Sequence, residues 1–433
     1  MQTKPEPLQV GDQIMDVDDL SVHFQLGGGV LGRLFGWGTK TVKAVDGVDF
    51  TLHKGEVIGL VGESGSGKTT LGRALLGMAP ATDGVITYQD VARGTRRVSH
   101  MGKAELRHLR TDVQMVFQDP HAALNPTMTI ETAVGHPLVI HEGAKGEELR
   151  KKVADTLERV GLSPAEQFMS KYPSDLSGGQ KQRAVIARSI IMEPQVLVAD
   201  EPVSMLDMSV RAKILQLMID LKDDLGLTYV YITHDLASAK FFCDRIAIMY
   251  LGRIVEIGTT EEIFANPRHP YTKALLKAIP EPDPELAVPR DLPRGEIPDA
   301  AQPPLGCSFH PRCPVAVATC GWESRDLKVA LEEHWVRKGD ATAYAKERKL
   351  LGKLDALDSP SQRVTLGKGN AGEALALLEG IRSENPDEPM WKGVDSMSAT
   401  PDGVEIVFHE AEDPALRPAG GAEVACVLYP RES

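Results

Sequence analysis

The sequence predicts an α/β domain with a mainly parallel sheet, followed by a loop-rich C-terminal extension. From about residue 9 to 265, short β-branched runs alternate with longer helical patterns, which is typical of parallel α/β folds. Three of the runs are apolar throughout, as expected for strands covered on both faces. From residue 266 to 314 prolines are frequent, and prolines interrupt regular structure. We therefore place a domain boundary near residue 266.

The three apolar runs lie at residues 57–61, 196–199 and 229–232, and each ends at a polar cluster. Ligands of open parallel sheets bind at the carboxyl ends of the strands. We therefore expect the chemistry of this chain at these three strand ends.

A helical insert is predicted in the middle of the domain. Leu149, Val153, Leu157 and Val160 recur at helical spacing, which indicates an amphipathic helix rather than another strand. We expect a helical subdomain at about residues 120–190.

Charge and hydropathy limit the classes of partner. The net charge of -13 argues against broad binding to nucleic acid or anionic lipid. The N-terminus lacks the apolar core of a signal peptide, and no apolar run approaches the roughly 20 residues that span a bilayer. We expect a cytosolic chain whose membrane role, if any, depends on docking to a membrane partner.

Residues 62–69 match the phosphate-loop pattern GxxxxGK[ST] and lie between a predicted strand and a helical run. Glycines allow backbone N–H groups to face phosphate oxygens, and the helix N-terminus adds its positive dipole end. Lys68 is expected at the β- and γ-phosphates and Thr69 on Mg²⁺. The predicted nucleotide-binding residues of this segment are Gly62, Ser64, Gly65, Ser66, Gly67, Lys68, Thr69 and Thr70.

Asp200 and Glu201 follow the run at 196–199 directly. Two adjacent carboxylates repel each other, so one of them is expected to meet a cation. Asp200 fits the Mg²⁺ side, and Glu201 fits the group that polarises the attacking water. An isolated Asp-Glu pair is usually an exposed acidic pair, but the phosphate loop favours the functional interpretation.

A second phosphate-binding element is predicted at residues 177–180, which precede another helical run. A hydroxyl and two glycines at a helix N-terminus can bind phosphate, although such a segment alone is more often a flexible turn. Its residues are Ser177, Gly178, Gly179 and Gln180.

Together these motifs resemble the nucleotide-binding domain of ABC ATPases, a P-loop NTPase fold, over roughly residues 12 to 265. The resemblance implies that Gln118 is the Q-loop glutamine, which also reaches Mg²⁺. It implies further that Asp207 is the D-loop aspartate and His234 the switch histidine. As alternatives, these side chains are a turn residue, a helix cap and a strand-end histidine. Trp37 is the candidate for stacking on adenine, or else a surface-loop tryptophan.

The resemblance also implies a mechanism. Two such domains would face each other head to tail, with each ATP held between one phosphate loop and the other domain's Ser177–Gln180 segment. ATP would close the dimer and Glu201 and His234 would act in hydrolysis, so that one chain alone is nearly inert.

Four local stretches resemble one branch of this family, the ATP-binding subunits of oligopeptide and dipeptide importers: residues 44–50, 118–126, 265–276 and 295–314. Relatives in this branch also power import of nickel and of some oligosaccharides. The resemblance implies a second ABC ATPase subunit, in a heterodimer rather than a homodimer, and two transmembrane permease subunits. An extracytoplasmic binding protein would act indirectly, and the chain would lie at the cytoplasmic face of the cell membrane.

Cys307, Cys313, Cys320 and Cys426 resemble the cysteine set that holds an iron–sulfur cluster in peptide-importer subunits. Four thiolates suit [4Fe–4S] or tetrahedral Zn²⁺, and their spacing does not choose between them. Unligated thiols are a third possibility.

The cysteines define the expected organisation of the C-terminal part. Residues 266–324 would be the importer-type extension, 325–415 an inserted lobe and 416–433 a tail that returns Cys426 to the other cysteines. Within this part, residues 342–357 and 371–381 are helix-like, and residues 402–410 alternate like a strand.

Two other functions fit parts of the pattern. A soluble ABC ATPase acting on nucleic acid or ribosomes usually carries two cassettes, a long coiled coil or a basic insertion, whereas this chain has one cassette and an acidic balance. Alternatively, the cysteine region is a metal- or redox-sensing module that regulates the ATPase.

Overall fold

The computed structural model describes residues 9–26, 40–90, 93–278 and 294–429. The chain divides into two compact units, Met1–Phe264 and Ala265–Ser433. Within the described segments, no helix combines the length and the apolar character needed to cross a bilayer.

The first unit contains a mainly parallel sheet with the strand order β10-β9-β3-β8-β7-β6. Strand β3 pairs in parallel with β8 and β9, and β7 pairs in parallel with β6 and β8, while β10 runs antiparallel to β9. All residues of β3, β7 and β8 are buried, which explains their continuous apolar sequence. The predicted α/β fold is confirmed. The strands are β3 (Val57–Val61), β6 (Val113–Val116), β7 (Val196–Asp200), β8 (Thr228–Thr233), β9 (Arg245–Tyr250) and β10 (Arg253–Thr259).

A second, antiparallel sheet of order β2-β1-β4-β5 completes the strands of this unit. The sequence pattern did not predict this sheet. Register shifts interrupt the pairing of β1 with β2 at several points, and such bulges break the two-residue alternation by which a half-buried strand is recognised. The strands are β1 (Gln13–Leu26), β2 (Lys40–His53), β4 (Asp83–Asp90) and β5 (Gly94–Arg97).

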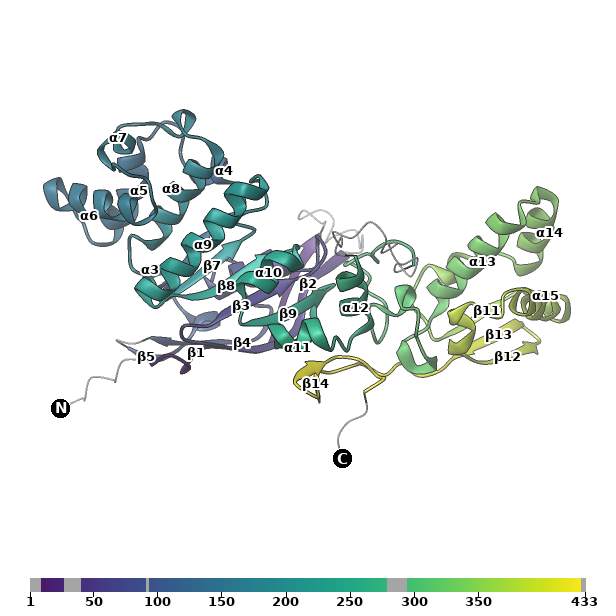
Figure 1. Cartoon of the computed structure of the whole chain (residues 1–433). Helices are drawn as coiled ribbons and strands as arrows, with labels where there is room; N and C mark the ends of the chain where they lie inside the picture. The colour runs from purple at the N-terminus through teal and green to yellow at the C-terminus, as the bar shows by residue number, and fades with distance from the viewer. Residues whose placement is uncertain (1–8, 27–39, 91–92, 279–293, 430–433) are drawn as a thin grey trace, which may run out of the picture. The chain divides into compact units, whose positions relative to one another are not determined.

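Helices α4 to α8 gather in a layer of their own, apart from the helices beside the sheets (Figure 1). Helix α6 contains Leu149, Val153 and Leu157 of the predicted amphipathic segment and has Val160 as its C-cap, and Val153 and Leu157 are buried, so this helix is confirmed. The helices of the layer are α4 (Pro120–Ala123), α5 (Ile130–His141), α6 (Gly146–Arg159), α7 (Glu166–Met169) and α8 (Gly178–Ile190). The others are α2 (Lys68–Leu75), α3 (Lys103–Asp112), α9 (Met208–Leu225), α10 (Leu236–Phe242) and α11 (Thr260–Ala265).

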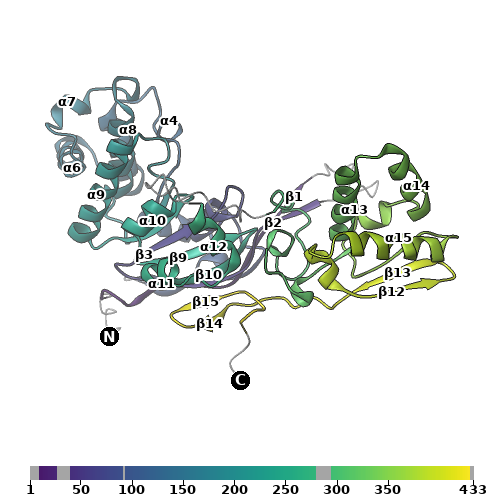
Figure 2. The same ribbon diagram turned by 45° about the vertical axis from the view of Figure 1, so that its right-hand side comes forward.

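The second unit begins with α12 (Pro270–Lys277), and loops and 3-10 turns at His310–Arg312 and Ala318–Cys320 lead into a lobe. In the lobe, α15 lies along an antiparallel sheet of order β11-β13-β12 (Figure 2). The sequence predicted one of these strands and missed the other two, since β11 is short and β12 is largely exposed. The elements are α13 (Ser324–Lys338), α14 (Ala341–Leu351), β11 (Arg363–Leu366), α15 (Ala371–Glu384), β12 (Val394–Thr400), β13 (Gly403–Phe408) and the hairpin β14 (Arg417–Ala419) with β15 (Ala422–Val424).

Candidate active site

The loop at residues 62–67 joins β3 to α2 at the carboxyl end of the parallel sheet. Gly67 has φ +99°, and a Cβ there would lie 2.0 Å from the Ala44 carbonyl oxygen. A Cβ on Gly62 would lie 2.2 Å from the Met249 carbonyl oxygen. No side chain caps the first turn of α2, so its N-terminal N–H groups point to where an anion would bind.

Lys68 lies inside the curve of this loop and is 6% exposed. Its Nζ donates to the carbonyl oxygens of Gly62 and Glu63, both at 2.8 Å, and to Ser66 Oγ at 3.2 Å. Burial lowers the pKa of Lys68, against the opposing effect of the Glu201 and Asp200 carboxylates. The loop therefore holds a cation close to two carboxylates.

The structure brings Thr69 and Asp200 together from different elements. Thr69 Oγ1, in the first turn of α2, donates to Asp200 Oδ1 at 3.0 Å. Asp200 ends β7 and is 3% exposed, and burial raises the pKa of its carboxyl. A hydroxyl and a buried carboxylate at this point form an oxygen donor set of the kind that Mg²⁺ prefers.

Glu201 lies between two polar side chains from other strand ends. Its Oε2 accepts a hydrogen bond from Gln118 Nε2 at 2.9 Å, and its Oε1 lies 3.0 Å from His234 Nδ1. Glu201 has φ +45°, a left-handed conformation that non-glycine residues rarely adopt and that is often found at functional sites. The carboxylate of Glu201 is thus held by two partners, and the backbone at Glu201 departs from the extended conformation of β7.

Residues 177–180 form the cap of α8. Ser177 Oγ accepts from the Gln180 N–H at 3.4 Å, and the Ser177 N–H donates to Gln180 Oε1 at 2.9 Å. Gly178 and Gly179 lie against Leu206 and Val210, so this segment adjoins the start of α9. The polar groups of Ser177 and Gln180 form hydrogen bonds with each other, and Ser177 and Gly178 are exposed.

Asp207 caps helix α9. Its Oδ1 accepts from the Val210 N–H at 3.0 Å and from Ser209 Oγ at 2.8 Å, and the first of these bonds contributes most to lowering the pKa of Asp207. Asp207 is thus the N-cap of α9, which agrees with the alternative interpretation of this residue as a helix cap. Met205 and Met208, on either side, are 61% and 85% exposed.

Two predicted binding residues remain to be placed. Thr70 lies in the first turn of α2, and Trp37 falls outside the described residues.

The sequence did not point to Gly252, which contacts the phosphate loop. Its N–H donates to the Ser66 carbonyl oxygen at 3.0 Å. Gly252 lies in the turn between β9 and β10 and has φ +82°. A glycine between two β-branched runs could have predicted this turn.

The four C-terminal cysteines line one small cavity of the second unit, with His269, Phe309 and His310 beside them. No disulfide joins any of these four cysteines to another described residue, and burial raises the pKa of Cys307, of Cys320, and of Cys313, the last to about 12. The Cys307 N–H donates to the Cys320 carbonyl oxygen at 2.9 Å. Among the described residues, the one group of three or more potential ligands within 4.8 Å of one another lies elsewhere, so no three of these sulfurs are that close.

Two family models match this chain. Residues 45–204 match the ABC transporter family, and residues 255–320 match the C-terminal region of oligopeptide/dipeptide transporters.

Curated relatives match over most of their length. The oligopeptide transport ATP-binding protein OppF of Escherichia coli (strain K12) is 43% identical over 310 residues, which are 71% of this chain and 90% of the relative. The dipeptide transport ATP-binding protein DppF of Haemophilus influenzae is 46% identical over 293 residues, 68% of this chain and 86% of the relative. The oligopeptide transport ATP-binding protein AppF of Bacillus subtilis (strain 168) is 40% identical over 328 residues, 75% and 96% of the two chains.

Proposed function

Since the chain belongs to the ABC transporter family, in the branch of oligopeptide and dipeptide transport ATP-binding proteins, we propose that it hydrolyses ATP to power a binding-protein-dependent importer of dipeptides or oligopeptides. The single observation that carries this proposal is the position of Glu201, bonded to Gln118 and His234. ATP hydrolysis coupled to transport is the activity of this family.

The phosphate loop would bind the nucleotide. The backbone N–H groups of residues 62–69 and the start of α2 would surround the β- and γ-phosphates. Lys68 Nζ, now bonded to loop carbonyls, would turn to the γ-phosphate. Thr69 and Asp200 would hold Mg²⁺ with Gln118, and the ion would neutralise charge on the phosphates.

Glu201 would orient and polarise the attacking water. A carboxylate held on both oxygens has little freedom, which favours a fixed direction for the water. His234 shares Glu201 Oε1 and would contact the γ-phosphate as it leaves. Hydrolysis then depends on three strand ends that meet at this point.

A second ATPase subunit would complete the site. Ser177 and the following helix N-terminus are exposed, as are Met205 and Met208. A phosphate-binding cap flanked by exposed methionines suits a surface that closes on a partner. We propose a heterodimer of related ATPases rather than a homodimer.

Two permease subunits would bind the helical layer near Gln118. Val139 and Ile140, near the end of α5, are 40% and 45% exposed, and exposed apolar side chains suit a protein partner. The chain would then act peripherally at the cytoplasmic face of the membrane, and the extracytoplasmic binding protein would reach it through the permeases.

The four cysteines would hold a [4Fe–4S] cluster. Zn–S bonds of about 2.3 Å place tetrahedral thiolates only about 3.8 Å apart, whereas no three of the described sulfurs lie within 4.8 Å of one another. A larger group is compatible with this spacing, and four thiols around one cavity, three of them buried, suit it. Such a cluster would supply a redox-active cross-link between residues 266–324 and the tail at 416–433, on either side of the lobe at 325–415.

Reconstitution with permeases and binding protein in liposomes tests the substrate class. Dipeptides or oligopeptides are expected to stimulate ATP hydrolysis and to accumulate inside the vesicles, while nickel and oligosaccharides leave both unchanged. Stimulation by nickel or an oligosaccharide alone would refute the peptide assignment.

Iron and sulfide content of anaerobically purified protein tests the cluster. We expect about four iron atoms per chain with the broad visible absorbance of an iron–sulfur protein. A colourless preparation with one zinc per chain would refute it.

A further inference from the structure

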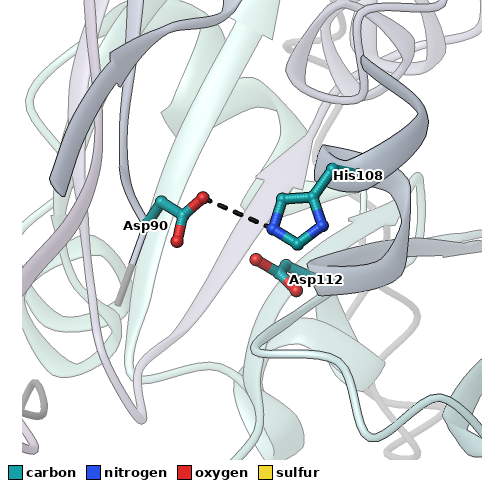
Figure 3. Close-up of side chains that lie close together, drawn as sticks. All are labelled: Asp90, His108 and Asp112. Atoms are coloured by element: carbon teal, nitrogen blue, oxygen red, sulfur yellow. Dashed lines mark ion pairs between the residues drawn. The ribbon is translucent and has the colours of Figure 1, made fainter. Parts of the chain in front are cut away.

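Three metal-ligand side chains meet in the first unit, outside the nucleotide site. Asp90 ends β4, and His108 and Asp112 lie four residues apart on α3, hence on one face of the helix. One ligand atom from each lies within 4.8 Å of the other two, and no other group among the described residues meets this criterion. Figure 3 shows the ring of His108 and the carboxylate of Asp112 projecting from the helix toward Asp90.

The separation of His108 and Asp90 matches two ligands of one cation better than a hydrogen bond. His108 Nε2 lies 3.6 Å from Asp90 Oδ2, which is too long for a hydrogen bond. Nitrogen and oxygen ligands at about 2.1 Å from a tetrahedral metal lie about 3.4 Å apart. The observed distance is therefore close to that between two ligands of one ion.

Neighbouring groups orient both carboxylates. Asp112 Oδ2 accepts from the Tyr88 hydroxyl at 3.3 Å, and Asp112 Oδ1 accepts from Thr111 Oγ1 at 3.2 Å. Asp90 Oδ1 accepts from the Arg93 N–H at 3.0 Å. Carboxylate oxygens retain a second lone pair for a metal, and hydrogen bonds of this kind orient metal ligands in known sites.

We propose that Asp90, His108 and Asp112 form a binding site for one divalent transition-metal ion, with Zn²⁺ as the best-matched cation. Two carboxylates and a neutral imidazole neutralise a divalent charge. Mg²⁺ and Ca²⁺ prefer oxygen ligands alone, whereas a nitrogen with two oxygens suits Zn²⁺. Water takes the fourth position, since the side chain of His108 is 34% exposed.

The ion joins β4 to the C-terminal end of α3. Asp112 is the last residue of α3, and β6 begins at Val113 and leads toward Gln118. The metal therefore stabilises the connection that precedes Gln118 and raises the stability of the native unit by mass action.

Calorimetric titration of the full chain with Zn²⁺ tests the site, with His108→Gln as the main variant and His100→Gln as the control. His100 is an exposed histidine in the turn just before α3. All three proteins retain the cysteines, so binding there is common to them. Wild type and His100→Gln are expected to bind one more equivalent of Zn²⁺ than His108→Gln, and Zn²⁺ should raise their melting temperature further.

Equal stoichiometry and equal melting shifts in wild type and His108→Gln would overturn the proposal. Anomalous diffraction at the zinc edge gives a second readout that does not depend on a variant. A peak within bonding distance of Asp90, His108 and Asp112 is expected in Zn²⁺-soaked crystals of the whole chain, and a peak only at the cysteines would overturn the site.

Discussion

At the scale of single residues, the candidate site depends on backbone conformations that most side chains do not adopt. Gly67 at φ +99° and Glu201 at φ +45° both lie in the left-handed region. The glycine has no Cβ and fits against Ala44, whereas the glutamate is held by Gln118 and His234. Position 67 therefore has no room for a side chain, whereas position 201 carries a carboxylate that bonds both Gln118 and His234.

Gly67→Ala is expected to destabilise the protein and to abolish nucleotide binding, because its Cβ would meet a backbone carbonyl at 2.0 Å. Gly143→Ala is the matched control, since Gly143 has φ +70° but no atom within 4 Å of an added Cβ. Urea unfolding should show Gly67→Ala to be about 2 kcal/mol less stable than the control. Equal stability of the two variants would contradict the close-approach argument.

At the scale of elements, Asp46 connects the two sheets of the first unit. It lies on β2, and its Oδ2 accepts from Arg253 Nε at 3.2 Å and Nη2 at 3.1 Å, on β10. His23 and Lys43 lie at its other side. Burial acts to raise the pKa of Asp46, but the charges of Arg253 and Lys43, with hydrogen bonds from Arg253 and His23, outweigh it, so the pKa is lowered. Sequence alone gave no sign of a pair 207 positions apart.

Asp46→Asn should reduce the free energy of unfolding by about 1–2 kcal/mol at neutral pH. Because the folded pKa lies below the unfolded value of about 3.9, this contribution is complete above that pH and is lost as the pH falls below it. Denaturant unfolding at several pH values should therefore show the variant and wild type converging in acid. Asp18→Asn, at an exposed position of β1, should match wild type throughout, and a pH-independent deficit in Asp46→Asn would contradict the charge argument.

At the scale of the whole molecule, the sequence predicted those features that follow from the pattern of neighbouring residues. The buried parallel strands and the phosphate loop follow from continuous apolar runs and a fixed glycine spacing. The antiparallel sheet was missed because bulges disrupt its alternation. The meeting of Asp90 with His108 and Asp112 was missed because tertiary packing alone brings β4 and α3 together. The lobe was predicted as an insert, but two of its strands carry too little periodic signal.

A composite nucleotide site predicts that defects in its two halves act in different chains. In a homodimer, Lys68→Ala and Ser177→Arg are each expected to remove ATP hydrolysis, because each change damages both sites; in a heterodimer each is expected to remove only one of the two sites. If the chain pairs with itself, a mixture of the two variants should regain about one quarter of the activity through random pairing. If it pairs with a second subunit, each transporter holds one copy of this chain, and the mixture should hydrolyse ATP no faster than the mean of the two variants. ATPase measurement of the mixture decides between these outcomes, and full activity of Ser177→Arg would contradict the composite site.

The most direct test of the account is ATP hydrolysis by the complete transporter with Glu201→Gln in this chain, measured while the partner subunit's own site is inactivated by a substitution in the partner. The amide keeps the shape of the side chain but does not polarise water as a carboxylate does, so hydrolysis should fall about 10²–10⁴-fold while ATP binding persists. Glu261→Gln, at an exposed position of α11 outside the helical layer, should hydrolyse ATP like wild type. Hydrolysis by Glu201→Gln at the wild-type rate would contradict the assignment of this site.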